Sequence, residues 1–382
     1  IEYWLHNRIR NIWDREEEFR RIRKSPPDRL TRADVDAYQF FELRRTLRRA
    51  AGHSSHYRGL FEKAGLRPEH VRDRKDLAAI PLLGPEELAE DPHGFLCLSL
   101  AEIARPYTFV TSGTTGPQKR IFWTRGDIER ITDFMAAGMG MVADPGDVVL
   151  ILLPDGRPDS QADLLRKGCR KLGVAAIAAD VNLSAEEHLK ILEDARATII
   201  FGYSGRIFRL SMELHAKGRD LSRQGVKVLF LAAEYLPQCR RRFLESLWNC
   251  RVHTHYGLTE MGLGVAVECR AREGYHFNEA DLLLEIVNPR TGGPSEAGEE
   301  GELVFTTLNR EAMPLIRYRT HDISRLIPGP CPCGADTLLR IDKVRKRTES
   351  IAVVGDGDEI FPALFDDALF EVPGLMDYQL TL

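Results

Sequence analysis

The chain lacks a strong excess of charge of either sign, a long apolar run and a dense set of cysteines. It has 53 lysines and arginines against 57 aspartates and glutamates, a formal net charge of −4, which gives no general attraction to nucleic acids or anionic membranes. No apolar run approaches the length of a membrane span, and the N-terminus does not have the pattern of a signal peptide. Seven scattered cysteines are too few for a disulfide scaffold. We therefore predict a cytoplasmic protein whose partners include neither nucleic acid nor membrane.

The length and composition predict a globular protein with more than one folding unit. A chain of 382 residues is long for a single core and predicts two or more domains. Hydrophobic residues at 43% and charged residues at 29% are typical of a soluble globular protein. The first residue is Ile1, which predicts that the natural start lies upstream.

The stretch 107–120 has neither the G-x-x-x-x-G-K-S/T pattern nor the G-x-G-x-x-G pattern of nucleotide-binding loops. It nevertheless has the chemistry to hold an anion, because a loop of glycines and hydroxyl residues joins two predicted strands. Glycine lets the backbone approach a ligand closely, and successive amides form a concave nest for an anion. Lys119 adds a mobile positive charge. We interpret the loop as a polyphosphate site, with a flexible hairpin turn as the alternative; its residues are Thr111, Ser112, Gly113, Thr114, Thr115 and Gly116.

Predicted strands and helices alternate after this loop. Such alternation predicts an α/β fold, with a parallel or mixed sheet covered by helices on both faces. In these sheets ligands bind at the carboxyl ends of the strands. The arginine-rich residues 1–60 have helical periodicity, and we interpret their charges as solvated helix faces rather than as a nucleic-acid surface. The predicted strands are 147–153, 174–177, 197–201, 226–231 and 251–255, and the predicted helices between them are 160–172, 184–195 and 206–217.

The string TSGTTGPQK closely resembles the phosphate loop of the acyl-adenylate-forming (AMP-binding) superfamily. YGLTE at 256–260 matches the superfamily's YGxTE motif, and GELVFTT and PLIRYRTHD resemble motifs of its phenylacetate–CoA ligase branch. The resemblance covers roughly residues 43–380. It implies a large N-terminal adenylate-forming domain at 1–345, with helix-flanked mixed sheets and a helical region at 1–80. Residues 346–382 would be the hinge and the truncated start of a small α+β C-terminal lid.

The resemblance also implies a nucleotide site that binds ATP and Mg²⁺. Tyr256 would pack on the adenine beside Gly257, Thr259 would contact the α-phosphate, and Glu260 would hold Mg²⁺, for which a carboxylate is a suitable ligand. The alternative is a turn after a buried strand, with Glu260 solvated. Asp322 would grip the ribose hydroxyls. The remaining residues implied at this site are Lys119 and the segment Ala233, Glu234 and Tyr235, whose backbone would line the adenine.

Three cysteines and a histidine form a candidate zinc set. Cys331 and Cys333 are separated by one residue, and Cys269 and His276 lie on a predicted hairpin. A Cys₃His set suits tetrahedral zinc, and the resemblance implies a structural Zn²⁺ at these places. The alternative is free thiols in surface turns. A weaker competing pair, Cys250 with His253, is interpreted as strand and core residues.

The hinge and the lid depart from the family pattern. The family's hinge reads GRxDD, and of its residues only Arg347 is matched here. In the family, a late lysine of the lid contacts the acid and the α-phosphate. This sequence has no counterpart of that lysine. Two explanations stay open: the rest of the lid is absent from this sequence, or this member is degenerate.

The resemblance therefore implies an ATP-dependent carboxylic acid–CoA ligase, an AMP-forming acid–thiol ligase. Glycines and aromatics near the predicted acyl pocket permit an aryl acid but do not demand one. One alternative is an adenylating enzyme with another acceptor, like the synthetases that adenylate a deazaflavin coenzyme. Another is a nucleotide- or acyl-binding protein without catalysis. A homodimer is left open.

Overall fold

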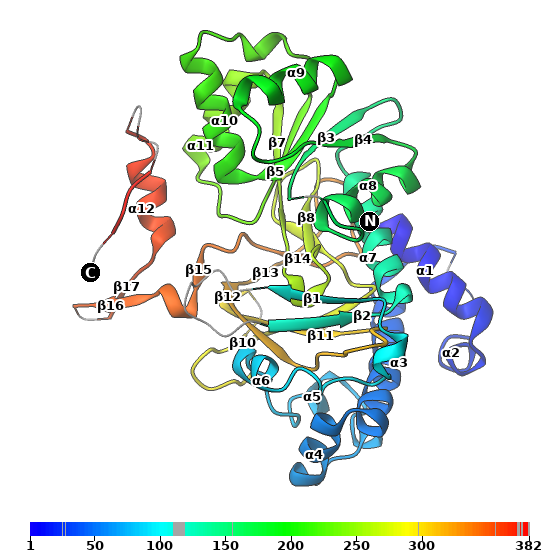
Figure 1. Ribbon diagram of the computed structural model, residues 1–382. Coiled ribbons are helices and arrows are strands. Elements are labelled where there is room, and N and C mark those ends of the chain that lie inside the picture. The colour runs from blue at the N-terminus through cyan, green and yellow to red at the C-terminus, as the bar shows by residue number, and fades with distance from the viewer. Residues whose placement is uncertain are drawn as a thin grey trace. The chain divides into compact units, whose positions relative to one another are not determined.

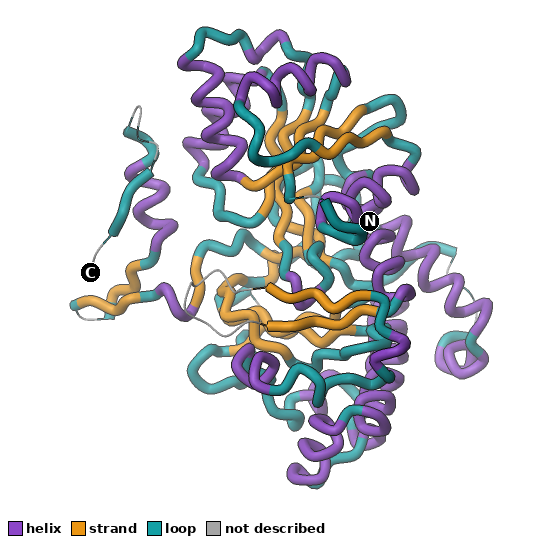
Figure 2. Tube along the Cα trace, viewed as in Figure 1, coloured by secondary structure: helices purple, strands orange, loops and turns teal. Residues whose placement is uncertain are grey.

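The computed structural model describes residues 1–24, 26, 28–109, 119–154, 156–296, 298–355, 357–372, 375 and 377–380. The chain divides into two compact units, which are described separately here. The first consists of Ile1–Ile131, Leu258–Val265 and His276–Asp342. The second consists of Thr132–Gly257, Ala266–Tyr275 and Lys343–Leu382. Figure 1 labels the elements, and Figure 2 shows how helices, strands and loops are distributed along the chain.

The first unit begins with helices, of which α3 and α4 start at side-chain caps. Thr31 and Asp34 form a capping box at the start of the longest of these helices, and Ser54 caps the next one. Their apolar faces form a buried cluster that includes Leu5, Ile9, Phe19, Tyr38 and Phe41. The helices are α1 (Glu2–Arg15), α2 (Glu17–Ile22), α3 (Arg32–His53), α4 (Ser55–Ala64), α5 (Arg74–Leu77) and α6 (Pro85–Glu90), with 3-10 turns η1 (Pro68–His70) and η2 (Leu100–Glu102).

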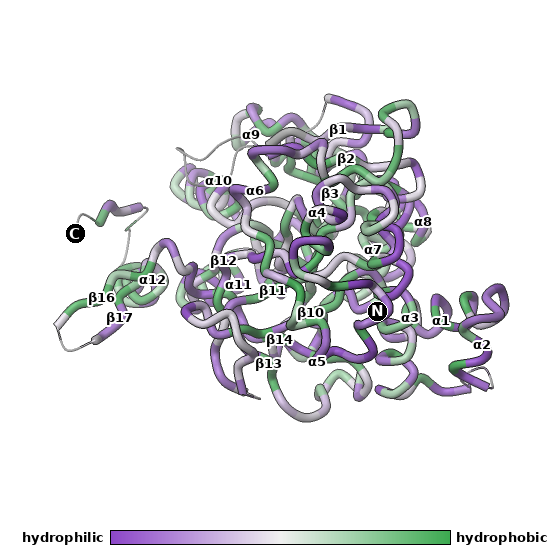
Figure 3. Tube along the Cα trace, turned by 90° about the horizontal axis from the view of Figure 1, so that it is seen from below, coloured by the Kyte–Doolittle hydropathy of each residue, from purple (hydrophilic) through white to green (hydrophobic). Residues whose placement is uncertain are grey.

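Several arginines of these helices contact acids. Arg32 contacts Glu279, and Arg48 contacts Glu18. In Figure 3, α1 and α2 alternate between hydrophilic and hydrophobic residues along their length. The arginine clusters thus lie on the polar sides of amphipathic helices that stabilise the first unit.

The strands of the first unit build the framework of the candidate site. The hairpin β1 (Arg105–Phe109) and β2 (Lys119–Trp123) is antiparallel, with Phe109 opposite Lys119. The strands β10 (Leu282–Val287), β11 (Gly301–Thr307) and β12 (Tyr318–Ser324) lie in that order in an antiparallel sheet. The short strands β13 (Leu326–Ile327) and β14 (Arg340–Ile341) pair with each other. The 3-10 turn η4 (Thr259–Met261) belongs to this unit too, as do parts of α7 (Arg125–Met139) and β9 (Tyr275–Phe277).

A mostly parallel sheet forms the centre of the second unit. Its strand order is β4-β3-β5-β6-β7-β8, and only β8 runs antiparallel to its neighbour. The central strands are buried on both faces, which explains their continuous apolar runs. The strands are β3 (Val148–Leu152), β4 (Ala175–Ala178), β5 (Ile199–Tyr203), β6 (Val228–Ala232), β7 (Arg251–Tyr256) and β8 (Ala266–Glu268).

Helices cover both faces of this sheet, as predicted. One face packs α9 (Ala185–Ala195), α10 (Ser204–Ala216) and α11 (Gln238–Trp248) into a single apolar cluster with β3, β5, β6 and β7. The helix α8 (Gln161–Leu172) is not part of that cluster and lies on the other side (Figures 1 and 2). The predicted capping box is present at α9, where Ser184 accepts from the Glu187 amide. The 3-10 turn η3 (Leu221–Arg223) follows α10.

The last described segment of the second unit contains short elements. They are β15 (Lys346–Arg347), η5 (Thr348–Ser350), the hairpin β16 (Ala352–Val354) and β17 (Asp358–Ile360), and α12 (Pro362–Leu369). The predicted α/β class with helix-flanked mixed sheets is confirmed, whereas the predicted lid boundary at 346 stays a prediction. Among the described helices, none combines the length and the apolar character needed to cross a membrane.

Candidate active site

The predicted phosphate loop, Thr111–Gly116, lies outside the described residues. The residues that flank this part of the chain are described, and they face each other as the Cα partners Phe109 and Lys119. Lys119 is therefore the first described residue after the loop, at the start of β2, and only 6% of it is exposed.

Lys119 contacts the predicted metal ligand. Its Nζ donates to Oε1 of Glu260 at 2.8 Å and to the hydroxyl of Tyr318 at 2.9 Å. The Tyr318 hydroxyl donates to the same Oε1 at 2.7 Å. Glu260 is 5% and Tyr318 2% exposed, so the three groups form a closed, buried hydrogen-bond triangle. The sequence predicted roles for Lys119 and Glu260 but not for Tyr318.

A second buried network holds the backbone of Glu260. Arg310 donates to the carbonyl oxygen of Glu260 at 2.6 Å. The guanidinium of Arg310 interacts in turn with Asp127. Burial alone would raise the pKa of Asp127, but Arg310 and Arg130 hold that pKa below its ordinary value. Glu260 sits in η4, beside half-buried Thr259, and its backbone is held by the buried hydrogen bond from Arg310.

The predicted ribose ligand Asp322 lies on the strand that carries Tyr318. It is 4% exposed, and its amide donates to Oγ1 of Thr320 at 3.1 Å. The register of β12 against β11 shifts in this region, where His321 has a φ of 62°. Such a bulge re-aims side chains and is over-represented beside active sites.

The carboxyl ends of β5, β6 and β7 share one edge of the parallel sheet in the second unit. The predicted adenine segment follows β6 there: Ala233 has a φ of 77°, a left-handed conformation that is costly for a residue with a Cβ. The exposed Glu234 accepts from the amide of Gly205 at 2.7 Å. Tyr256 and Gly257, both half-buried, stand at the end of β7. The structure thus brings these four predicted residues to the edge where the topology predicts a ligand.

Tyr235 connects the same edge to α12. Its hydroxyl donates to Asp367 at 2.9 Å, and Asp367 also pairs with Arg345. Burial, followed by the hydrogen bond to Asp367, raises the pKa of Tyr235 to about 12, so the phenol stays protonated. Arg347, the residue that matches the hinge motif, is half-buried in β15.

Three aromatic rings of β5, β6 and β7 pack against one another. The rings of Phe201 and His255 stack with centroids 5.3 Å apart, and Phe230 meets Phe201 edge-on at 5.3 Å. Burial lowers the pKa of His255 to about 4, so the imidazole is neutral at pH 7. The rings form a buried aromatic cluster, in which Phe201 is 6% and Phe230 3% exposed.

The predicted zinc residues of the first unit lie together. The ligand atoms of His276, Cys331 and Cys333 are all within 4.8 Å of one another, and His276 Nε2 is 3.4 Å from Sγ of Cys333. Ligands of one tetrahedral zinc stand about 3.5 Å apart when the Zn–N and Zn–S bonds are about 2.0 and 2.3 Å. Cys269, the fourth predicted ligand, is a buried residue of the second unit seven positions before His276.

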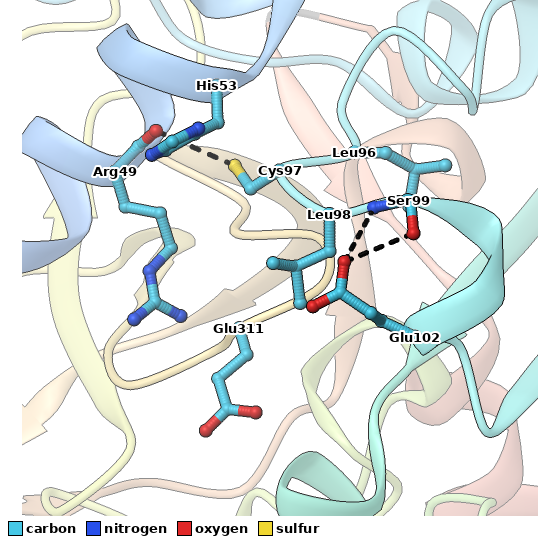
Figure 4. A pocket seen from close by; sticks show the side chains of 8 residues that line it. All are labelled: Arg49, His53, Leu96, Cys97, Leu98, Ser99, Glu102 and Glu311. Atoms are coloured by element: carbon cyan, nitrogen blue, oxygen red, sulfur yellow. Dashed lines mark hydrogen bonds between the residues drawn. The ribbon is translucent and has the colours of Figure 1, made fainter.

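A cavity of about 640 Å³ lies in the first unit, apart from every predicted site residue. Figure 4 shows Arg49 and His53 on one side and Glu311 on another. The Glu311 carboxylate accepts from Thr124 at 2.8 Å, and Glu102 accepts from Ser99 at 3.1 Å. The walls therefore carry both signs of charge, and both acids already have partners. The remaining lining residues are Leu96, Cys97 and Leu98.

Residues 106–309 match the family described as AMP-binding enzyme. The chain is also 30% identical over 364 residues to the phenylacetate-coenzyme A ligase of Escherichia coli (strain K12), an alignment that covers 93% of this chain and 81% of that protein. The chain belongs to the AMP-binding enzyme family. Phenylacetate-coenzyme A ligases of Aromatoleum evansii and Thermus thermophilus are 29% and 28% identical over 92% of the chain, and 78% and 79% of their lengths are covered. The predicted family and branch are confirmed.

Solved structures give the same fold for this member of the AMP-binding family. A 2-hydroxyisobutyryl-CoA ligase in its postadenylation state, in complex with R3-HIB-AMP, has a TM-score of 0.81 at 20% identity, covering 90% of this chain and 74% of that one. An open conformation of that ligase, in complex with 2-HIB-AMP and CoA, has a TM-score of 0.79. The match extends across both units of the present chain and supports the fold assignment.

Proposed function

We propose that this member of the AMP-binding family is an ATP-dependent carboxylic acid–CoA ligase. Its relatives are named phenylacetate-coenzyme A ligases over nearly the whole chain. The observation that carries the proposal is the buried contact of Lys119 with Glu260, directly after the segment that resembles a phosphate loop. A buried carboxylate and amine at this position suit a magnesium-bound polyphosphate.

The reaction has two steps. In the first, a carboxylate oxygen of the acid attacks the α-phosphorus of ATP, a P–O bond forms, and the bond to the β-phosphate oxygen breaks to release pyrophosphate. In the second, the thiol of CoA loses its proton and attacks the carbonyl carbon of the acyl-adenylate. The C–S bond forms, the C–O bond to AMP breaks, and the acyl-CoA thioester leaves with AMP as the other product.

The chain's own contribution to the first step is positioning and neutralisation of charge. Lys119 would pair with phosphate oxygens, the hydroxyls and amides of Thr111–Gly116 would hold the β- and γ-phosphates, and Thr259 would contact the α-phosphate. The carboxylate of Glu260 fits Mg²⁺, because it is a hard oxygen ligand held in a fixed position. Mg²⁺, when bound, would reduce the negative charge that the attacking carboxylate meets.

The adenosine end would be held by residues from several of the segments that carry the resemblance. Asp322 would accept hydrogen bonds from the ribose hydroxyls, which suits a carboxylate on a rigid strand. Tyr256 would offer an aromatic face to the purine, and Gly257 would permit close approach. The backbone of Ala233, Glu234 and Tyr235 would line the adenine, and Arg347 would act at the hinge.

The acid that we propose is an aryl carboxylic acid. The rings of Phe201, Phe230 and His255 form an aromatic cluster on β5, β6 and β7, beside which the ring of the acid would pack. Aromatic rings favour offset-stacked and edge-on contacts with another ring. The neutral imidazole of His255 adds polarity without charge.

A structural zinc would join the hairpin around Cys269 and His276 to the turn of Cys331 and Cys333. The distance of 3.4 Å between His276 Nε2 and Cys333 Sγ supports this proposal, because two ligands of one tetrahedral zinc stand about that far apart. The small number and wide scatter of the seven cysteines in the sequence support the proposal of a cytoplasmic location. A homodimer stays a prediction, which sedimentation can check.

The proposal is tested by measuring pyrophosphate release from MgATP with a panel of aryl and alkyl carboxylic acids. We expect release with at least one aryl acid, followed by thioester formation only when CoA is added. Release without any use of CoA would indicate another acceptor. Binding of ATP with no release on any acid would instead indicate a protein without catalysis.

A further inference from the structure

We propose that Tyr318 is a positioning residue for the adenylation step, whose phenol holds Glu260 and Lys119 in the one arrangement that serves magnesium-bound ATP. This inference rests on the proposed function. It adds a residue for which the sequence motifs gave no role.

The geometry of the triangle carries the inference. Oε1 of Glu260 accepts two hydrogen bonds, from Tyr318 at 2.7 Å and from Lys119 at 2.8 Å. Among the described residues, no hydrogen bond is directed at its other oxygen, Oε2. The phenol thus fixes the rotation of the carboxylate through one oxygen and leaves the second for a cation. The same phenol oxygen accepts from Lys119 at 2.9 Å, which keeps the amine beside the carboxylate.

The phenol can do this because its own backbone is held on both sides. Leu83 donates to the carbonyl of Arg317 and accepts from the amide of Arg319, each at 2.9 Å. On the other side Tyr318 pairs with Phe305 of β11. The side chain of Arg317 is anchored on the carbonyl oxygen of Ile80 at 2.6 Å. The residue therefore lies between two neighbouring segments, and its ring has little room to move.

Removing a residue that orients a metal ligand lowers the metal affinity by a measurable factor. Residues that orient a metal-binding side chain typically cost about 10–100-fold in metal affinity when they are removed. Tyr318→Phe would keep the buried ring but would remove the donor to Glu260 and the acceptor for Lys119. We therefore expect the preference for MgATP over metal-free ATP to fall by about tenfold or more.

A matched control is available in the same unit. Tyr38 is also buried, and its hydroxyl donates to the carbonyl of Ala280 at 2.9 Å and accepts from Asn309 at 3.0 Å. Tyr38→Phe thus also removes a buried hydroxyl that donates one hydrogen bond and accepts one, and in the part of the chain that the structure describes this hydroxyl does not contact Glu260. A general loss of stability would affect both variants, whereas a loss of magnesium preference should appear only in Tyr318→Phe.

The experiment is calorimetric titration of ATP into the protein, once with excess Mg²⁺ and once with EDTA. We expect the ratio of the two dissociation constants to collapse in Tyr318→Phe and to stay within about twofold of wild type in Tyr38→Phe. A second variant, Lys119→Met, keeps the phenol on Glu260. It should weaken ATP binding in both titrations while keeping most of the ratio.

An unchanged ratio in Tyr318→Phe would overturn the inference, because it would show that the phenol does not position Glu260. If Tyr318→Phe does not fold, Lys119→Met decides alone. Loss of the ratio in this variant, which keeps the phenol on Glu260, would overturn the inference. Failure of the wild type to bind ATP at all would instead refute the proposed function.

Discussion

Replacing Glu260 by glutamine should separate the structural role of its contact with Lys119 from its functional role. Both side chains are at most 7% exposed, and Nζ lies 2.8 Å from Oε1. Removing one partner of a buried ion pair costs about 3–5 kcal/mol, because the other charge is left without compensation. Glutamine keeps an oxygen that accepts hydrogen bonds, so we expect a loss near the lower end, about 3 kcal/mol of unfolding free energy.

The double variant Glu260→Gln, Lys119→Met removes the stranded charge as well. Neutral replacement of a whole buried pair is often close to neutral for stability, so we expect urea unfolding to return to within about 1 kcal/mol of wild type. Binding of MgATP should not return, because the metal ligand and the phosphate partner are both absent. The two assays are equilibrium urea unfolding and calorimetric titration of MgATP.

Two results would refute this reasoning. Recovery of MgATP affinity in the double variant would mean that the pair only supports the fold. A loss of less than about 0.5 kcal/mol in Glu260→Gln, the range of ordinary surface substitutions, would mean that the pair is not buried and coupled as the structure describes.

Three further predictions concern other parts of the chain. Asp322→Ala should raise the ATP dissociation constant about tenfold or more, because it removes a charge-assisted hydrogen bond. It should also abolish the preference for ATP over 2′-deoxy-ATP in a titration. An unchanged preference would remove Asp322 from the ribose site. Cys333→Ser should lower zinc content, measured by elemental analysis, and unfolding free energy, whereas Cys239→Ser in α11 should leave zinc unchanged. Burial alone would raise the pKa of Asp163, but Lys167 and neighbouring donors lower it to about 2; its stabilisation is therefore present above the unfolded pKa near 3.9 and is lost as pH falls through 2. The unfolding free energy of Asp163→Asn, measured in urea, should accordingly be about 1–2 kcal/mol lower than that of the wild type above pH 5 and should approach the wild-type value near pH 2.

Much of the second unit could be predicted from local sequence patterns. Ser184 and Glu187 predicted the start of α9, and the apolar run at 147–153 predicted β3 (Val148–Leu152). Both signals come from residues that are neighbours in the sequence, where propensity and capping decide the structure. The strand predicted at 197–201 is displaced to Ile199–Tyr203, because its limits are set by the parallel neighbours rather than by its own residues.

The candidate site could be predicted only in part. Lys119, Glu260 and Asp322 stand in motifs whose residue types suit phosphate, metal and ribose. The sequence around Tyr318 predicts no role for its phenol, because its partner Glu260 lies 58 positions away in the sequence. That contact depends on the register of β12 and on the backbone of Leu83, and neither leaves a local signal. The predicted loop at 111–116 lies outside the described residues, so its role stays a prediction.

The most direct test of the account is acid-dependent release of pyrophosphate from MgATP by the wild type and by Glu260→Gln, assayed with the same panel of aryl acids. We expect one of these acids to support release by the wild type, with thioester formation on addition of CoA, and we expect Glu260→Gln to lose this release. Equal release by both proteins would contradict the claim that the contact of Lys119 with Glu260 marks the site of adenylation.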